Sequence, residues 1–380
     1  MLIHRILSQL AGKNYNGSDV YACGDCVVNQ NLIKISVCIP AYNRAGVLPA
    51  LLESILTQNY DDFEVVINED GSPEREKIRK VVEHYSILYP DRIRYFENVH
   101  NLGYDANLRS LVERASGEYC LFMGNDDLMC PSALETISGA ISRYPKIGVF
   151  LRSFEAFDGS PQNIVQTFKY FDRELFFPAG AGTISTFYKR SVVIPGVTFH
   201  REAALTFATD KFDGSLLYQI YLIANILVEW NGVFSPEIVT LYRNGGTPDF
   251  GNSASEKGKF VPQTRTPESS VNFMQGMLEI AQFVENTRHV NIYRSILRDL
   301  SNYSYPILFF QADKPLWVFF QYYWSLIKLG FGRQLLFHVY FFAILLLGTQ
   351  RMEKIIASIK NWLGHTPVIG SVYSGDDKQR

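Results

Sequence analysis

The sequence predicts an α/β protein with a doubly wound, mostly parallel sheet that carries helices on both faces, followed by a helical, aromatic-rich C-terminal region. Two observations support this fold class. Between residues 33 and 131, short β-branched runs alternate with segments of helical apolar spacing, which implies parallel strands joined by right-handed crossovers. From residue 271 onward the apolar spacing is helical, in a chain that is 14% aromatic overall.

The predicted elements follow one another regularly. The run from Tyr119 to Met123, bounded by Gly117 and Gly124, has the length of a buried strand. In chain order, strands are expected over 33–43, 63–68, 92–98 and 119–123, and helices over 47–58, 76–88 and 106–115. Beyond them, 147–154 and 193–199 have strand-like patterns, 177–186 is expected to be a loop, and a long apolar helix is expected from about Ser215.

Length and composition narrow the range of functions. A chain of 380 residues with 47% apolar and 19% charged residues can bury a sizeable core, and a net charge of -2 argues against nucleic-acid binding. Five cysteines, an odd number, favour a reduced, cytosolic protein. Cys23 and Cys26 have the spacing of half a zinc site, but no second pair follows. The first residues contain no apolar stretch long enough for a signal peptide, so secretion is not expected.

Polar residues follow three of the predicted strands, at Pro40–Asn43, at Glu69–Ser72 and at the adjacent acids Asp126 and Asp127. Because the carboxyl ends of parallel strands meet at one edge of a sheet, these residues should share a crevice. Neighbouring carboxylates repel unless a cation or hydrogen-bond donors hold them, and oxygen ligands suit Mg2+ or Mn2+. Turn and helix-capping chemistry explains the acid pair equally well by itself. The convergence of three strand ends favours a nucleotide site.

Neither standard phosphate-binding loop is present in the sequence. No GxGxxG follows the first strand, and no GxxxxGK[ST] occurs. Gly180, Gly182 and Ser185 lie outside any predicted strand-to-helix junction, so we expect them in a flexible loop.

Residues 35–131 resemble the nucleotide-binding half of the family 2 glycosyltransferases, which have a GT-A fold. The pieces that carry the resemblance are SVCIPAYNR, SILTQNYDDFEVVINEDGS, NLGYDANLRSL, and SGEYCLFMGNDD followed by Pro131. Their order and spacing match as well as their letters. The resemblance implies a GT-A catalytic domain that binds a nucleoside-diphosphate sugar.

The resemblance also implies residue roles. In this family the counterparts of Ala41, Tyr42 and Asn43 line the nucleotide, that of Asp70 contacts the base, and the last acid of a D-x-D motif ligates a divalent metal. Glu69 replaces an aspartate conservatively, whereas Gly124 stands where the family commonly has the first acid, so weaker metal binding is expected and a metal-independent variant stays open. The candidate nucleotide-binding residues are Pro40, Ala41, Tyr42, Asn43, Asp70, Asn125 and Arg243, and the candidate ligands for Mg2+ or Mn2+ are Asp126 and Asp127.

Inverting transfer also needs a base that removes the proton of the acceptor hydroxyl. Asp213, just ahead of the helix expected near Ser215, matches the position at which the family places this acid, with Gln219 where the family has an arginine. Asp210 is the second choice and His200 an alternative base. Helix capping is the other explanation for both acids.

The segment 244–270 is rich in Gly, Ser, Thr and Pro and lacks periodicity. Long loops of this kind commonly act as lids, so we expect a mobile loop that closes over donor and acceptor, with Arg243 at its root contacting the diphosphate. A solvated linker is the alternative.

The C-terminal region predicts either a membrane-surface contact or a packing surface. Its uninterrupted apolar stretch, 335–348, is too short to span a bilayer but suits an interfacial helix. The alternative is a helical cap that packs on the catalytic domain or on a second copy of the chain. Aromatic residues suited to the headgroup level are Trp317, Tyr322, Tyr323 and Trp324, and the basic residues Lys328, Arg333, Arg351, Lys354 and Lys360 outnumber Glu353.

Together these features predict a metal-dependent, inverting hexosyl- or deoxyhexosyltransferase on the inner face of the cell membrane. It would move a sugar from a nucleotide-sugar donor to a polyprenyl-diphosphate-linked saccharide acceptor in O-antigen or capsule synthesis, which similar bacterial enzymes carry out. A non-catalytic nucleotide-sugar-binding or scaffold protein is the alternative, because of Gly124; a nucleotidyltransferase fits less well, since its basic Gly-rich loop is missing. The expected organisation is an N-terminal extension (1–33), a catalytic domain (34–243) with nucleotide-binding (34–131) and acceptor (132–243) halves, a mobile loop (244–270), a helical membrane-associating or oligomerising region (271–365) and a disordered tail (366–380).

Overall fold

The computed structural model describes residues 33–246, 248–349, 351–352, 354–355 and 358. The predicted N-terminal extension before Ile33, the Cys23–Cys26 pair and the tail from residue 366 lie outside this part of the chain. Within it, a ten-stranded sheet has the order β3-β2-β1-β4-β9-β6-β10-β5, with β7 beside β6 and β8 beside β10.

The nucleotide-binding half supplies four parallel strands. Their bounds are β1 Ile35–Ala41, β2 Phe63–Glu69, β3 Ile93–Glu97 and β4 Tyr119–Phe122. Strands β2 and β4 are buried along their whole length, as expected for parallel strands that carry helices on both faces. The prediction of this half from apolar periodicity is confirmed.

The second half of the sheet mixes orientations. Strand β9 lies antiparallel between β4 and β6, whereas β6 and β10 run parallel to one another. Pro236 in β10 coincides with a shift of register between Ser235 and Ile238, which is where a strand tolerates a proline. The bounds are β5 Leu128–Met129, β6 Ile147–Phe157, β7 Ile164–Phe168, β8 Leu175–Phe177, β9 Val197–His200 and β10 Asn231–Arg243.

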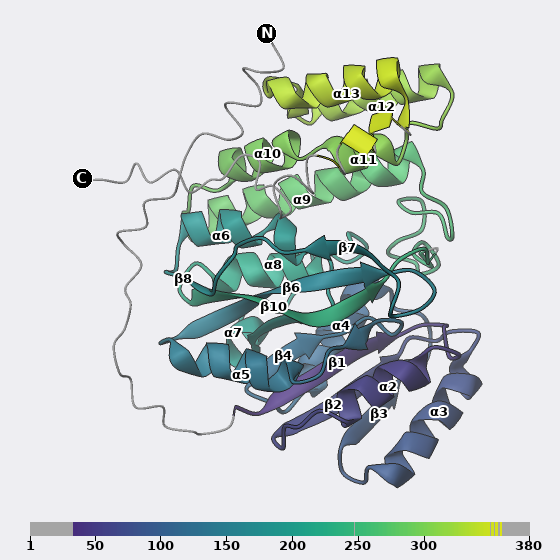
Figure 1. The fold of residues 1–380 in the computed structure, drawn as a ribbon, viewed down its shortest axis with the longest axis vertical. Coiled ribbons are helices and arrows are strands. Elements are labelled where there is room, and N and C mark those ends of the chain that lie inside the picture. Colours follow the sequence, from purple (N-terminus) through teal and green to yellow (C-terminus); the bar gives the residue numbers. More distant parts are fainter. Residues whose placement is uncertain (1–32, 247, 350, 353, 356–357, 359–380) are drawn as a thin grey trace.

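Helices cover both faces of the sheet (Figure 1). Helices α2 (Leu48–Leu56), α3 (Arg75–Leu88) and α5 (Ala133–Arg143) share one apolar cluster. Helices α4 (Tyr104–Arg114), α7 (Arg201–Leu205) and α8 (Tyr218–Ile226) belong to the other cluster. The chain therefore changes face between β3 and β4, so β1 and β4 are neighbours at a topological switch point. Ligands of open α/β sheets bind beyond the carboxyl ends of such strands.

The C-terminal helices stack on the α8 face, at the top of Figure 1 and on the side away from α2 and α3. Their buried side chains continue the same apolar cluster as α4 and α8. No helix in the described part of the chain is both long and apolar enough to cross a bilayer. The bounds are α9 Pro267–Arg288, α10 Tyr293–Asn302, α11 Tyr305–Phe309, α12 Leu316–Lys328, the short η2 Phe331–Arg333 and α13 Leu335–Leu347.

The expectation of a flexible loop over 177–186 is wrong. Helix α6 spans Ala181–Phe187, directly after β8, and is followed by the short η1 at Lys189–Ser191. Gly180 is its N-cap with φ of 124°, a value that residues with a Cβ rarely adopt. The residues from Thr183 to Phe187 are buried against the C-terminal helices. Glycines at a helix start were thus misread as a loop signal.

Candidate active site

The carboxyl ends of β1 and β4 meet, as predicted from the three polar strand ends. Asn125, just after β4, donates from Nδ2 to the carbonyls of Tyr42 (3.3 Å) and Asn43 (3.0 Å) beyond β1. Asn43 and Arg44 both adopt the left-handed conformation, with φ of 53° and 63°. This conformation costs residues with a Cβ free energy, and the hydrogen bonds from Asn125 are among the contacts that hold the loop in it.

Asp126 lies between two arginines. Arg44 Nη1 is 2.5 Å from its Oδ2, and Arg243 donates from Nε to its carbonyl oxygen at 2.9 Å. Burial raises the pKa of the Asp126 carboxyl, while the nearby Arg44 and Arg243 cations lower it, so that burial prevails. The predicted site residues Asp126 and Arg243 therefore meet, and Arg44, which was not predicted, joins them. Its position directly after Pro40–Asn43 was the signal that could have identified it.

Asp127 lies behind Asp126 and is only 2% exposed. Its Oδ1 accepts a hydrogen bond from the Arg243 backbone N–H at 2.8 Å. Burial, with the Asp126 charge adding to it, raises the pKa of Asp127 to about 8. A Cβ added at Gly124 would lie 2.3 Å from Asp127 Oδ2. A side chain at position 124 would therefore collide with the Asp127 carboxyl in its present orientation.

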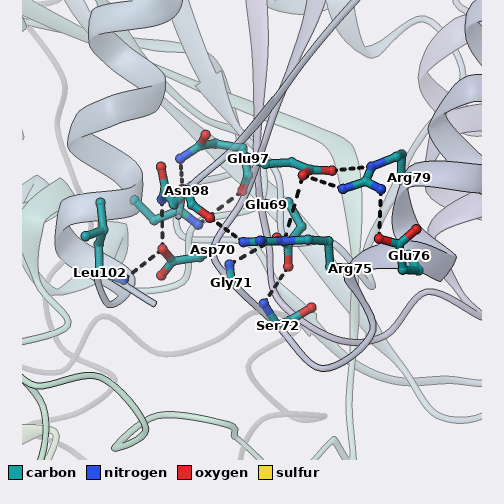
Figure 2. Close-up of polar contacts among 12 residues, drawn as sticks. Glu69, Asp70, Gly71, Ser72, Arg75, Glu76, Arg79, Glu97, Asn98 and Leu102 are labelled. Atoms are coloured by element: carbon teal, nitrogen blue, oxygen red, sulfur yellow. Dashed lines mark hydrogen bonds and ion pairs between the residues drawn. The ribbon is translucent and has the colours of Figure 1, made fainter. Parts of the chain in front are cut away.

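Asp70 organises the loop beyond β3 (Figure 2). Its Oδ1 accepts hydrogen bonds from Asn98 Nδ2 (2.8 Å) and the Leu102 N–H (2.9 Å), and its Oδ2 accepts one from the Gly103 N–H (3.0 Å). Burial raises the pKa of the Asp70 carboxyl, although these hydrogen bonds oppose the effect. Asp70 thus joins the ends of β2 and β3 at the crevice.

The neighbouring Glu69 shapes its own turn rather than pointing to the crevice. It accepts hydrogen bonds from the backbone N–H groups of Gly71 (3.0 Å) and Ser72 (2.6 Å) and from Arg75 Nε (2.7 Å), as Figure 2 shows. The conservative change to Glu at position 69 is therefore compatible with the turn.

Two polar atoms at these strand ends have no hydrogen-bond partner among the described residues, Asn43 Oδ1 and Ser72 Oγ, and both are buried. Buried polar atoms are usually paired, so these two are available to a ligand. Tyr42 and Asn43 are half-buried, whereas Ala41 is fully buried and offers the site only its backbone; its carbonyl accepts from the Asp70 N–H at 2.9 Å. Pro40 is half-buried within β1.

The segment after Arg243 packs against the loop that follows β1 and the start of α4. Asn43 Nδ2 lies 3.4 Å from Asp249 Oδ2. Glu256, only 3% exposed, accepts hydrogen bonds from the N–H groups of Tyr104 and Gly251, both at 2.8 Å. Glu256 therefore ties this segment to the first turn of α4, where a carboxylate is favoured by the helix dipole.

The candidate base Asp213 forms a two-point ion pair with Arg109 of α4. Arg109 was not predicted from the sequence, because nothing in its local pattern distinguishes it. The distances are 2.6 Å from Nη1 to Oδ1 and 2.8 Å from Nη2 to Oδ2. Asp213 precedes α8, whose first turn is capped instead by Asp105. Capping of α8 therefore does not explain Asp213. The backbone carbonyl of Asp210 accepts from the Asp213 N–H within the same turn.

His200 lies at the opposite end of the strands from Asp126. It is opposite Tyr119, at the amino end of β4, whereas Asp126 follows the carboxyl end. Its Nδ1 accepts from the Ala203 N–H and its ring stacks on Trp230. His200 caps α7 and lies away from the carboxyl ends of the parallel strands, which argues against it as the base.

A divalent metal fits the site only in a limited way. In the described part of the chain no three His, Cys, Asp or Glu side chains converge. Asp126 offers one carboxylate near the surface, and Asp127 is buried behind it. Mg2+ is commonly held by one or two carboxylates together with substrate phosphates and water. The residues present therefore fit a metal that arrives with a diphosphate.

The doubly wound, mostly parallel sheet with helices on both faces agrees with the GT-A fold expected from the sequence. Residues 36–205 match the family described as Glycosyl transferase family 2. The resemblance predicted from residues 35–131 is thereby confirmed for this part of the chain.

Individual relatives match over the same region. A GalNAc(5)-diNAcBac-PP-undecaprenol beta-1,3-glucosyltransferase of Campylobacter jejuni is 33% identical over 105 residues, 27% of this chain and 33% of its own length. An uncharacterized glycosyltransferase of Haemophilus influenzae is 36% identical over 114 residues, 30% of this chain and 36% of its own. The putative glycosyltransferase EpsE of Bacillus subtilis is 29% identical over 127 residues, which are 33% of this chain and 45% of its own length. The chain thus spans less than half the length of these relatives.

Solved structures agree on the fold. Residues 1–349 of TarS from S. aureus, in complex with UDP-GlcNAc, superpose with a TM-score of 0.54 at 19% identity, covering 77% of this chain and 79% of TarS. The complex of the same protein with UDP gives a TM-score of 0.55 at 16% identity. At this identity the likeness establishes the GT-A fold.

Proposed function

We propose that the protein is an inverting glycosyltransferase that moves a sugar from a nucleoside-diphosphate sugar to a hydroxyl of a saccharide. One observation carries the proposal: Asp126 lies between Arg44 and Arg243 at the switch point of the sheet. Negative charge develops on the departing diphosphate, and cations fixed beside it stabilise that charge. The match of residues 36–205 to family 2 supports the same reaction class.

The nucleoside end of the donor would lie over the ends of β1 to β3. The unpartnered atoms Asn43 Oδ1 and Ser72 Oγ and the ring of Tyr42 are the groups that support this assignment. Asp70 would contact the base, as the family resemblance implies. Because the structural relative TarS has been crystallised with UDP and UDP-GlcNAc, a uridine nucleotide is the first donor to test.

A bound Mg2+ or Mn2+ would supply Lewis-acid stabilisation of the diphosphate leaving group. Asp126 is the residue that would hold it, with the buried Asp127 behind. The metal requirement is part of the proposal and is tested separately from transfer.

Asp213 is the proposed base. Its role would be to remove the proton of the acceptor hydroxyl as that oxygen attacks the anomeric carbon from the face opposite the diphosphate. Arg109 would position the carboxylate, since a two-point ion pair fixes its orientation. Asp210 remains the second choice.

A polyprenyl-diphosphate-linked saccharide is the proposed acceptor class. The Campylobacter jejuni relative is named for an undecaprenol-linked saccharide, and an acceptor of this kind is held in a membrane. We therefore propose that the chain works at the inner face of the cell membrane, in the synthesis of a surface polysaccharide such as O-antigen or capsule.

The α12–α13 pair offers the surface for this contact. Stacking of Tyr323 on Phe341, with ring centroids 3.9 Å apart, joins the two helices. Their outer faces leave large apolar side chains exposed beside the basic Lys328 and Arg333, a combination suited to an anionic headgroup region. The exposed apolar residues are Leu316, Trp317, Phe320, Trp324, Leu335, Val339, Phe342, Leu346 and Leu347. A homo-oligomer joined through this face is the alternative.

The segment 244–270 is the proposed lid. Its contacts through Asp249 and Glu256 lie next to the residues assigned to the nucleotide. Release and closure of this segment would admit the donor and then exclude water, which would otherwise hydrolyse it.

The test is transfer of labelled sugar from UDP-sugars to a polyprenyl-diphosphate-linked saccharide, with and without Mn2+, followed by determination of the product anomer. We expect transfer with inversion, at least a hundredfold loss in Asp126→Asn, and little change in the control Asp61→Asn, which lies before β2 at the opposite edge of the sheet. Absence of transfer from every nucleotide sugar, together with nucleotide binding, would favour the non-catalytic alternative. Retention of the anomer would contradict inversion.

A further inference from the structure

The ion pair between Arg44 and Asp126 engages one oxygen of the carboxylate that is proposed to hold the metal. Arg44 Nη1 is 2.5 Å from Asp126 Oδ2, and the two side chains are 29% and 11% exposed. A Cβ added at Gly246 would lie 3.7 Å from both Arg44 Nη2 and Asp126 Oδ2. The start of the segment proposed as the lid therefore lies next to the pair.

The backbone holds Arg44 toward Asp126 at some cost. Arg44 and its neighbour Asn43 are both left-handed, which costs on the order of 1 kcal/mol each. Hydrogen bonds compensate on both sides: Asn125 donates to the carbonyl of Asn43 at 3.0 Å, and the Ala45 N–H donates to Glu74 at 2.9 Å. Such a loop indicates that the position of Arg44 is specified by the fold.

The second arginine is held differently. Arg243 donates to the backbone carbonyls of Asp126 and Gly159, and its guanidinium lies 4.7 Å from the centroid of the Phe157 ring. These main-chain contacts do not compete with a metal. Arg44, in contrast, contacts the carboxylate oxygen Oδ2 itself, so a metal on this carboxylate would lie beside the Arg44 cation, which repels it.

We propose that Arg44 changes its ion-pair partner during donor binding. It neutralises Asp126 before the donor binds, and its guanidinium moves to the diphosphate when donor and metal enter. This inference depends on the nucleotide and metal of the proposed function. A metal that binds alone meets the repulsion of the Arg44 cation beside the carboxylate, whereas the diphosphate supplies a further anionic partner toward which that cation can move. Metal and nucleotide should therefore strengthen each other's binding, and by the same factor.

The experiment measures Mn2+ binding to the full chain by calorimetry, without nucleotide and with saturating UDP. In the unaltered protein we expect weak binding alone and much tighter binding with UDP. In Arg44→Gln, Mn2+ should bind alone roughly fivefold more tightly, because no cation then competes for the carboxylate, while UDP binds more weakly. The ratio of the two Mn2+ dissociation constants should fall toward one.

Matched variants separate this effect from general loss of charge. Arg143→Gln removes a different arginine–glutamate pair, with Glu174, and should leave both Mn2+ constants unchanged. Asp126→Asn should abolish the Mn2+ response. If Arg44→Gln does not fold, as judged by its melting transition, Arg44→Lys serves instead; its weaker pairing with the carboxylate should give an intermediate ratio.

The outcomes distinguish this inference from the proposed function. Unchanged or weaker Mn2+ binding in Arg44→Gln, with UDP still strengthening Mn2+ binding in the unaltered protein, overturns the exchange and leaves the transferase proposal intact. No Mn2+ or Mg2+ binding to any variant in the presence of UDP overturns both the exchange and the metal requirement. Sugar transfer in the absence of metal would then decide whether the transferase proposal survives.

Discussion

Arg109 and Asp213 form a two-point ion pair, in which Nη1 lies 2.6 Å from Oδ1 and Nη2 lies 2.8 Å from Oδ2. The two residues are far apart in sequence, on α4 and ahead of α8, and Arg109 also donates to the Thr209 carbonyl at 2.9 Å. An acid held by both oxygens has a fixed orientation. This geometry suits a base that must face an acceptor hydroxyl, and it gives the first prediction.

Asp213→Asn should lower kcat by about 10^2 to 10^4, the usual contribution of a positioned general base. Arg109→Gln should lower kcat less, without changing the KM for the donor, because it disturbs only the orientation of the carboxylate. Asp210→Asn is the matched control and should keep most activity. Steady-state kinetics with varied donor and acceptor provide the measurement. Full activity in Asp213→Asn would eliminate this residue as the base.

Gly124→Asp, which restores the acid common in the family, should destabilise this protein. The new Cβ would lie 2.3 Å from Asp127 Oδ2, and crowding of this kind in a packed interior costs about 1–3 kcal/mol. Gly124→Ala should show most of the loss, since the collision begins at Cβ. Urea unfolding of each variant tests this. The double change Gly124→Ala with Asp127→Ala should recover stability relative to the sum of the single changes; additive losses would contradict the steric account.

Stability should fall with rising pH because of Asp127. Its folded-state pKa is raised to about 8 from an ordinary value of 3.8, so the folded protein binds a proton that the unfolded chain releases. The stabilisation from this proton is complete below about pH 4 and is lost as pH rises toward 8. The variant Asp127→Asn keeps the size and shape of the side chain but has no carboxyl group that can titrate. Between pH 4 and 8 the melting temperature of the unaltered protein should fall more than that of Asp127→Asn. Parallel curves would refute the raised pKa of Asp127.

Replacing Trp317 and Trp324 by Ser should weaken binding to vesicles that contain anionic lipid, by roughly tenfold or more given the apolar area removed. Both side chains are more than half exposed, so the fold should tolerate the changes. Ile87→Ser with Val99→Ser removes exposed apolar groups elsewhere and should leave binding unchanged. Vesicle co-sedimentation is the measurement. If the tryptophan variant instead loses self-association, measured by sedimentation velocity, and binds vesicles as before, the oligomer alternative is supported.

Apolar periodicity was sufficient to predict the nucleotide-binding half, because β1 to β4 and α2 to α4 form from local patterns that tertiary packing reinforces. It failed at α6, where Gly180 and Gly182 gave a loop-like composition to a helix whose residues are buried by the C-terminal helices. Strand β10 was also missed, since Pro236 interrupts its pattern at a bulge that only the neighbouring β6 explains.

The candidate site divides in the same way. The sequence alone determined that polar residues after β1, β2 and β4 would share one edge, since parallel strands place their carboxyl ends together. Only the tertiary structure decided which of these residues meet: Arg44 on Asp126, Asp127 in the space beside Gly124, Arg109 on Asp213, and His200 at the opposite edge. Side chains remote in sequence are paired by the packing of loops and helices, and no local periodicity records that packing.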